Sequence, residues 1–362
     1  MSTFNLDNIL SQFLIEGKVE SVKPLGNGLI NDTFRVVTEG DAPDYVLQRI
    51  NNNIFTDVDL LQHNIEAVTG HIRRKLEAAG ADDIDRKVLR FVPTQQGKTY
   101  YHDNEGRYWR VSVFIPDAVT YEQVDPTSSR NAGKAFGEFE SMLVDLPEQL
   151  GETIPDFHNM ELRARQLQEA IEQDKAGRVA GVADIIADLQ KDMHEMCKAE
   201  RLFREGKLPK RICHCDTKVN NMMYDKQGNV LCVIDLDTVM PSFVFSDYGD
   251  FLRTGANFVA EDDPKIENVG FNQDIFRAFT EGYIESARSF LTPVEVENLP
   301  YAVALFPFMQ CVRFFADYLN GDTYYKIAYP EHNLVRTRNQ QALYHRVTDN
   351  YDMMDNFIRT LI

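Results

Sequence analysis

With 362 residues, of which 43% are hydrophobic, the chain is long enough to form two cores or one domain divided into two lobes. Its 56 acidic residues outnumber its 38 lysines and arginines, and the formal charge of −18 excludes nucleic acid as a favoured partner, because two polyanions repel each other. Residues 1–8 lack the basic start and apolar core of a signal peptide, and we expect no segment to reach the length of a membrane span. These features favour a cytoplasmic protein without a membrane partner.

The first part of the chain, residues 1–116, has a strand-rich pattern with one long helix. Short strands are expected at Val22–Leu25, Thr33–Thr38, Tyr45–Ile50, Lys87–Phe91 and Tyr108–Phe114. Apolar residues recur at steps of three and four from Val58 to Leu76, which predicts an amphipathic helix of about five turns. Five strands with one inserted helix is the order of a kinase-like small lobe.

The remainder, residues 117–362, is mainly helical in pattern. Helices are expected at Ser128–Leu143, Glu161–Gln173, Ile185–Arg204, Gln273–Phe290 and Pro293–Leu319. The last of these begins with a capping signal, because Thr292 and Glu295 flank a proline at the first helical position. Only Met222–Ile234 looks like strand, as a hairpin. The sequence therefore predicts an α+β fold with a small sheet lobe and a larger helical lobe.

Two short segments carry the side chains that phosphoryl transfer from a nucleotide requires. The first runs from His214 to Asn221 and reads H-x-D-x-x-x-x-N, and the second ends an apolar run at Asp235. We predict that Asp216 is the catalytic base, since an ionised carboxylate can accept the proton of an attacking hydroxyl. The oxygens of Asn221 and Asp235 suit Mg²⁺. Because a hairpin between the segments returns the chain to its starting point, we expect these side chains to lie close together.

Other polar residues near these segments have candidate roles. Lys218 belongs to the first segment and is expected to reach the transferring phosphoryl group. Asp237, two residues after Asp235, is either a further metal ligand or a residue that keeps the loop in shape. Asp250 is expected to hold the catalytic loop in place, and the pattern gives Asp247 no role.

A glycine-rich turn, Gly26-Asn27-Gly28, follows the first expected strand and is a candidate contact for the phosphates of ATP. Glycines let backbone N–H groups approach phosphate where a side chain would obstruct them. The same pattern also marks ordinary hairpin turns, so the turn alone does not decide between the two readings.

The long helix carries Glu66, which resembles the glutamate that anchors a strand lysine in kinases. The third expected strand, however, offers Gln48 where that lysine would stand, with Arg49 on the other face. Either Gln48 binds phosphate as a neutral donor, or Arg49 or Lys218 supplies the missing charge.

Several phrases of the sequence resemble the N-acetylhexosamine 1-kinases, a branch of the aminoglycoside phosphotransferase and choline kinase group. The phrases are Leu25–Asn31, Leu47–Asn51, His214–Asn221, Ile234–Thr238 and Tyr329–Arg338. The resemblance implies a protein-kinase-like bilobal fold with a five-stranded antiparallel sheet. It also implies ATP- and Mg²⁺-dependent phosphorylation of the anomeric hydroxyl of N-acetylglucosamine or N-acetylgalactosamine.

The same resemblance implies which residues meet the sugar. Asp216, Arg313 and Tyr324 would face it, with Arg253 nearby, and guanidinium groups suit sugar hydroxyls and an acetamide carbonyl. Cationic choline or aminoglycosides would be repelled. Leu29 stands where a member of that family carries histidine after the second glycine, so the sugar preference stays open.

Each of these readings has an alternative. Arg313 is spaced to pair with Asp317 on one helix, and Tyr324 has the chemistry of an ordinary packing residue. For the whole protein, the alternatives are a kinase of the same fold that acts on another sugar or an amino alcohol, and a nucleotide-binding pseudokinase.

Overall fold

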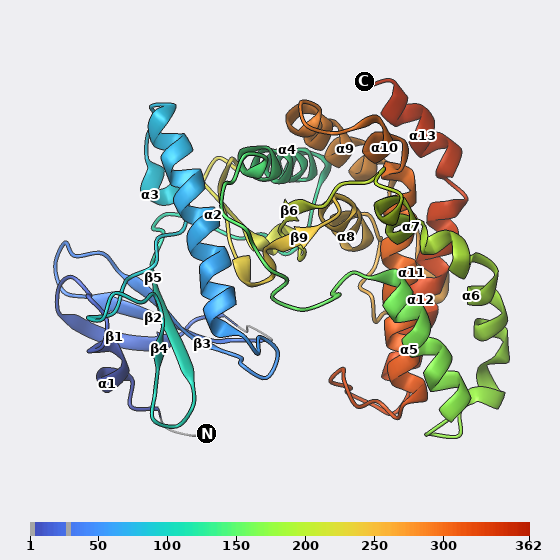
Figure 1. Ribbon diagram of the computed structural model, residues 1–362, viewed down its shortest axis with the longest axis horizontal. Coiled ribbons are helices and arrows are strands. Elements are labelled where there is room, and N and C mark those ends of the chain that lie inside the picture. Colours follow the sequence, from blue (N-terminus) through green and yellow to red (C-terminus); the bar gives the residue numbers. More distant parts are fainter. Residues whose placement is uncertain (1–3, 27–29) are drawn as a thin grey trace. The chain divides into compact units, whose positions relative to one another are not determined.

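The computed structural model describes residues 4–26 and 30–362, and the chain forms two compact units (Figure 1). The first unit comprises Met1–Val119, Asp145–Pro155 and Met223–Val239. The second comprises Thr120–Val144, Asp156–Met222 and Met240–Ile362.

The first unit is built on a five-stranded antiparallel sheet with the order β1-β2-β3-β5-β4, which confirms the predicted fold class. Its strands are β1 (Val19–Pro24), β2 (Asp32–Thr38), β3 (Tyr45–Ile50), β4 (Tyr101–His102) and β5 (Tyr108–Val113). Its helices are α1 (Leu6–Leu10), α2 (Val58–Ala78) and α3 (Ile84–Lys87). The predicted amphipathic helix is α2, which lies beside the sheet in Figure 1.

One predicted strand of this sheet is wrong. Lys87 ends the short helix α3, and Phe91 makes only an isolated bridge with Ser112 on β5. The chain then closes a tight turn, in which the backbone N–H of Thr94 donates to the carbonyl of Lys98 at 2.7 Å. Two backbone hydrogen bonds still join this segment to β5, from Val92 to Val111 at 2.8 Å and from Val113 to Arg90 at 2.9 Å, but the two residues of β4 supply the fifth strand.

The two faces of the sheet differ in polarity. Apolar side chains on one face form a core, and its buried members are Ile9, Leu10, Phe13, Val36, Tyr45, Leu47, Val92, Trp109 and Val111. Side chains alternate between faces along a strand, so Gln48, next to Leu47, lies on the opposite face. There Gln48 stands in register with Thr33 on β2 and Arg110 on β5. A polar row therefore crosses three strands.

The second unit is mainly helical, as predicted. Its helices are α4 (Pro126–Leu143), α5 (Met160–Gln173), α6 (Ala183–Met196), α7 (Lys198–Arg204), α8 (Phe245–Gly255), α9 (Gln273–Ala287), α10 (Pro293–Glu297), α11 (Leu299–Leu319), α12 (His332–Thr348) and α13 (Tyr351–Arg359). The capping box of Thr292 and Glu295 is present, but it starts the short α10 rather than one long helix. The predicted helix over 185–204 is likewise two helices that meet at Cys197.

Four short strands complete the fold. The predicted hairpin is present as β7 (Met222–Tyr224) and β8 (Val230–Val233). A second pair, β6 (Arg211–Cys213) and β9 (Met240–Ser242), is antiparallel and was not expected from the sequence. These strands deliver the chain to the segments with the phosphoryl-transfer motifs.

Helix α11 forms the centre of the second unit and packs against α12, α8 and α5. Contrary to the expectation from sequence, its length and apolar composition would allow it to cross a membrane. However, 89% of its most apolar stretch is buried inside the protein, as in the core helix of a soluble protein. Because α11 is buried in the core, its apolar composition does not require a membrane.

Candidate active site

Asp216 lies just after β6, in a loop whose backbone turns sharply. Cys215 has φ +63°, a left-handed conformation that non-glycine residues rarely adopt. The side chain of Asn221 closes the loop, because its Nδ2 donates to the carbonyl of Asp216 at 2.8 Å and to its Oδ2 at 3.1 Å. The backbone N–H of Asp216 donates to Nδ1 of the fully buried His214 at 3.3 Å. Local contacts thus fix the Asp216 carboxylate in place.

The carboxylate of Asp247, in the first turn of α8, holds this loop by hydrogen bonds to its backbone. Its two oxygens accept the backbone N–H groups of His214 at 2.8 Å and Cys215 at 2.7 Å. Thr217 adds a bond from its hydroxyl to the Asp247 carbonyl at 2.7 Å. Asp247, for which the sequence pattern predicted no role, therefore holds the loop by hydrogen bonds, whereas Asp250 pairs with Arg253 at 2.9 Å and its role in the loop stays a prediction.

Lys218 and Asp216 form an ion pair, with Nζ 2.9 Å from Oδ2. Burial by itself raises the pKa of Asp216, but attraction to Lys218 and the hydrogen bonds of Lys218 and Asn221 outweigh it and lower the pKa below its usual value. Asp216 is therefore ionised at neutral pH, as a proton acceptor must be. About a third of its side-chain surface is exposed, so a substrate can reach it.

The residues predicted to hold Mg²⁺ offer oxygens of the right kind. The Nδ2 of Asn221 donates to Asp216, and the other polar atom of its amide, Oδ1, is an acceptor. Asp235 follows β8 with φ +61°, a strained position typical of functional sites. An amide oxygen and a carboxylate are hard ligands that fit Mg²⁺. That they bind one ion stays a prediction, because the two residues belong to different units.

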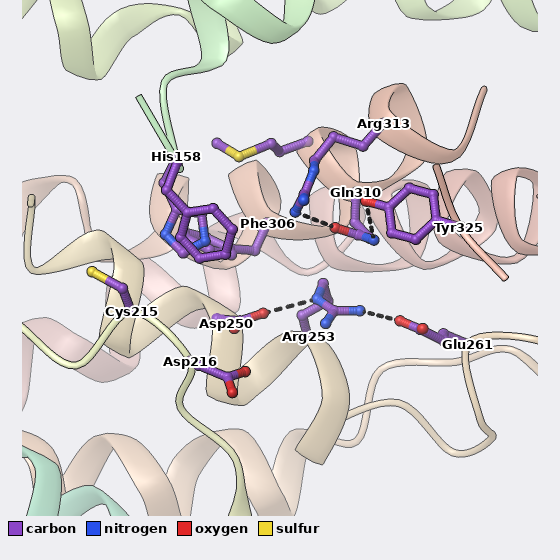
Figure 2. Close-up of a pocket in the computed structure, with 12 residues that line it drawn as sticks. His158, Cys215, Asp216, Asp250, Arg253, Glu261, Phe306, Gln310, Arg313 and Tyr325 are labelled. Atoms are coloured by element: carbon purple, nitrogen blue, oxygen red, sulfur yellow. Dashed lines mark hydrogen bonds and ion pairs between the residues drawn. The ribbon is translucent and has the colours of Figure 1, made fainter. Parts of the chain in front are cut away.

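A cavity of about 160 Å³ opens beside Asp216 within the second unit (Figure 2). The residues that line it are Phe157, His158, Cys215, Asp216, Asp250, Arg253, Glu261, Phe306, Met309, Gln310, Arg313 and Tyr325. The candidate base thus lies on the wall of a cavity with both charged and aromatic side chains.

Two of the predicted sugar-contacting residues, Arg253 and Arg313, line this cavity. Figure 2 shows Arg253 between two acids, with its Nε 2.9 Å from Asp250 and its Nη1 2.6 Å from Glu261. Arg313 instead donates to the neutral Oε1 of Gln310 at 3.1 Å. The alternative pairing of Arg313 with Asp317 is not formed, because the Asp317 carboxylate accepts backbone N–H groups of residues 323–325.

Tyr324 does not line the cavity, and 70% of its surface is exposed. Its neighbour Tyr325 lines the cavity instead, and the two rings pack edge to face with centroids 4.8 Å apart. The turn held by Asp317 explains the exchange, since it presents one of two successive tyrosines inward and the other outward. Tyr325, rather than Tyr324, is therefore the tyrosine of this turn that lines the cavity.

His158 is a cavity residue that sequence reasoning missed. Its Nδ1 lies 3.0 Å from the hydroxyl of Ser246, and its ring packs on Phe306 with centroids 4.9 Å apart. Burial and the nearby charge of Arg313 lower the pKa of His158 well below its usual value, so the ring is neutral. No local motif marks His158, because only the fold brings it to Asp216.

The predicted nucleotide contacts lie in the first unit. Gly26 has φ +70°, which favours glycine at this turn, whereas Asn27, Gly28 and Leu29 lie outside the described residues. Gln48 donates from Nε2 to the Thr33 hydroxyl at 3.3 Å.

Within residues 4–26 and 30–362, Glu66 pairs with no lysine as it would in a kinase. Glu66 accepts a hydrogen bond from the hydroxyl of Thr99. Arg49 pairs with Asp32 at 2.6 Å and its guanidinium lies over the ring of Phe4, on the face of the strand opposite to Gln48. Lys218 is engaged with Asp216, as described above.

Residues 21–283 match the sequence profile of the phosphotransferase enzyme family. The chain belongs to this family. The match extends over both motif segments and the helices α2, α4 and α8, so it includes the loop of Asp216 and part of the cavity wall.

Solved structures share the fold of this phosphotransferase at low sequence identity. An aminoglycoside phosphotransferase from Alicyclobacillus acidocaldarius is 12% identical with a TM-score of 0.64, and 98% of each chain is covered. Spectinomycin phosphotransferase in complex with ADP and spectinomycin is 12% identical with a TM-score of 0.55, covering 98% of this chain and 99% of that one. Ethanolamine kinase from Plasmodium vivax is 14% identical with a TM-score of 0.54, covering 90% of this chain and 84% of that one. The kinase-like fold of small-molecule phosphotransferases is thereby confirmed.

Proposed function

We propose that this phosphotransferase is an ATP-dependent kinase that phosphorylates the anomeric hydroxyl of N-acetylglucosamine or N-acetylgalactosamine. The observation that carries the proposal is the position of Arg313 in the cavity beside Asp216. Its guanidinium carbon lies 5.5 Å from the ring centre of Phe157 and 5.8 Å from that of Tyr325. Proteins commonly bind an ammonium group against aromatic rings, but here the guanidinium of Arg313 already lies beside these two rings. A cationic acceptor substrate would therefore be repelled by Arg313.

The other charges of the cavity also favour a neutral acceptor rich in hydroxyl groups. Arg253 is shared by Asp250 and Glu261, and the one negative charge that these three groups leave over is offset by Arg313 in the same cavity. The contact of Arg313 with Gln310 leaves guanidinium N–H groups for an oxygen acceptor such as an acetamide carbonyl. Hydroxyl groups of a sugar can bond to the acids and arginines alike.

In the proposed reaction, Asp216 accepts the proton of the anomeric hydroxyl as that oxygen attacks the γ-phosphorus of ATP. The new O–P bond forms as the bond to the β-phosphate oxygen breaks, and ADP leaves. Lys218, 2.9 Å from Asp216, stabilises negative charge on the phosphoryl group. Asn221 and Asp235 would hold Mg²⁺, which neutralises phosphate charge when bound.

The remaining parts of the proposal concern the nucleotide and the location of the protein. The segment Gly26-Asn27-Gly28, with Gln48 and Glu66, would contact ATP in the first unit. The relative that was crystallised with ADP supports a nucleotide donor. A cytoplasmic location agrees with the supply of ATP, and the charge of −18 argues against a nucleic acid partner.

An acceptor panel tests the proposal. The purified protein with Mg²⁺ and ATP would be offered N-acetylglucosamine, N-acetylgalactosamine, glucose, choline, ethanolamine and an aminoglycoside, with ADP release measured by a coupled assay. Phosphorus NMR of the product would identify the phosphorylated position, and an anomeric phosphate from an N-acetylated sugar is expected. The D216N variant should lose activity by about 10²–10⁴-fold, because it lacks the proton acceptor.

The outcomes separate the alternatives. Preferred turnover of choline or ethanolamine would overturn the assignment of a sugar while keeping the kinase. Nucleotide binding in a thermal shift assay without turnover of any acceptor would instead indicate a pseudokinase.

A further inference from the structure

A buried arginine, Arg110, lies beside Gln48 on the polar face of the first unit's sheet. It stands opposite Gln48 in the register of β3 and β5, and its Nε donates to the Gln48 Oε1 at 2.9 Å. Its Nη1 donates to Oε1 of Gln62 on α2 at 3.3 Å. Only 3% of the side chain is exposed, so the charge of Arg110 must be balanced by protein groups.

The balancing group is Asp237, whose Oδ1 lies 2.6 Å from Nη1 of Arg110. Asp237 is equally buried, with 4% of its side chain exposed. Its second oxygen, Oδ2, accepts a hydrogen bond from Nδ2 of Asn31 at 2.7 Å. Its backbone carbonyl accepts the hydroxyl of Thr153 at 2.9 Å. Side chain and backbone of Asp237 are thus both fixed by residues of the first unit.

These contacts decide between the two roles left open for Asp237. A carboxylate that is buried, paired with an arginine and bonded to an amide has the contacts of the structural role. It is a structural anchor, and the residue that it anchors lies two positions before it. Asp235, with φ +61°, begins the short 3₁₀ helix Leu236–Thr238 that contains Asp237.

We propose that Arg110 is the positioning residue of the metal-binding loop. Through Asp237 it holds Asp235 in its strained conformation, and through Gln48 it ties that loop to the strand that lacks a lysine. This inference rests on the proposed phosphoryl transfer. It assigns the fixed positive charge of the nucleotide unit to β5, whereas a kinase lysine would lie on the third strand.

Arrangements of this kind change metal affinity without touching the metal. Groups that orient a metal ligand typically alter metal affinity or activity by about 10–100-fold when they are replaced. Lysine at position 110 would keep the charge, but its ammonium group cannot contact Gln48, Gln62 and Asp237 in the fixed geometry of a guanidinium. The R110K variant therefore separates charge from positioning.

The test measures metal and nucleotide binding rather than turnover. Mn²⁺ would be titrated into the protein with a non-hydrolysable ATP analogue and followed by electron paramagnetic resonance, and analogue binding without metal would be measured by calorimetry. For R110K we expect the Kd for Mn²⁺ to rise by about 10–100-fold, with little change in metal-free nucleotide affinity. The double variant R110Q/D237N, which removes both buried charges, guards against a simple failure to fold.

A second arginine–aspartate pair in the same unit provides the matched control. Arg107 lies 2.8 Å from Asp103, and R107K should leave Mn²⁺ affinity at the wild-type value. If R110K and R110Q/D237N melt at a lower temperature but bind Mn²⁺ as the wild type does, Arg110 is only structural and the proposal is overturned. If the wild type itself binds no nucleotide analogue, the proposed function fails, and that result is distinct from an unchanged R110K.

Discussion

Replacement of Gly249 by alanine probes how closely two helices of the cavity wall must approach. Gly249 lies on α8, and a β-carbon there would stand 2.5 Å from the carbonyl oxygen of Ala302 and 2.5 Å from Cδ2 of Phe306, both on α11. Ordinary contacts begin at about 3.4 Å, so the helices must separate by roughly 1 Å. The obstructing carbonyl belongs to a helix backbone and cannot move alone.

Both stability and activity should fall in G249A. Overpacking of this kind costs about 1–3 kcal/mol, against a gain of about 1 kcal/mol from the helix propensity of alanine. Helix α8 carries Asp250 and Arg253, and α11 carries Phe306 and Arg313, so the separation displaces opposite walls of the cavity. Because a misplacement of about 1 Å can cost up to 10²-fold, we expect kcat/KM to fall by about 10–100-fold.

Calorimetry and a coupled assay of ADP release check this prediction. The control is G181A in the 3₁₀ helix Val179–Val182 of the same unit, where an added β-carbon meets no atom within 4 Å. We expect G181A to match the wild type in melting temperature and kcat/KM. A G249A protein with wild-type values of both would refute the reasoning from helix contact.

Two further predictions concern proton equilibria. The K218M variant removes the positive charge that lowers the pKa of Asp216, so this pKa should rise. Because activity requires the ionised carboxylate, the acid limb of a kcat/KM profile measured between pH 4 and 9 should move to higher pH. An acid limb at the wild-type position would contradict this prediction. Burial and the neighbouring Asp247 raise the pKa of Glu140 well above its usual value. Its contribution to stability is therefore present below the pKa of the unfolded chain and is lost as pH rises through the raised pKa of the folded protein. E140Q resembles the protonated form, and its melting temperature should fall less than that of the wild type between pH 6 and 9; parallel curves would count against the assignment.

Much of the fold could be predicted because its periodic segments bury apolar side chains. The stripe from Val58 onward marked α2, and the capping signal at Thr292 marked a true helix start. Helix α12 was missed for the opposite reason. Its buried face includes Asn333, Thr337 and Gln340, polar residues with internal hydrogen bonds, so no apolar period reveals it.

The residues of the candidate site also differ in whether the sequence could reveal them, according to whether their contacts are local or distant along the chain. Asp216, Lys218 and Asn221 could be predicted because their contacts lie within a few residues of one another, and a local motif records such contacts. Asp247 escaped because its hydrogen bonds reach back to residues more than 30 positions earlier. His158 escaped because its neighbours in the cavity come from other helices.

Arg110 is the extreme case of a residue without a local signal. Its partners Gln48 and Asp237 lie 62 and 127 positions away, and only the register of β3 with β5 and the return of the chain after β8 bring them together. A prediction that looks for a lysine on the third strand uses only the order of residues along the sequence. The sheet instead places a different cation on the neighbouring strand, on the same face, where cross-strand pairing makes the two positions adjacent. Strand register, rather than strand sequence, therefore determines where this unit can carry its buried positive charge.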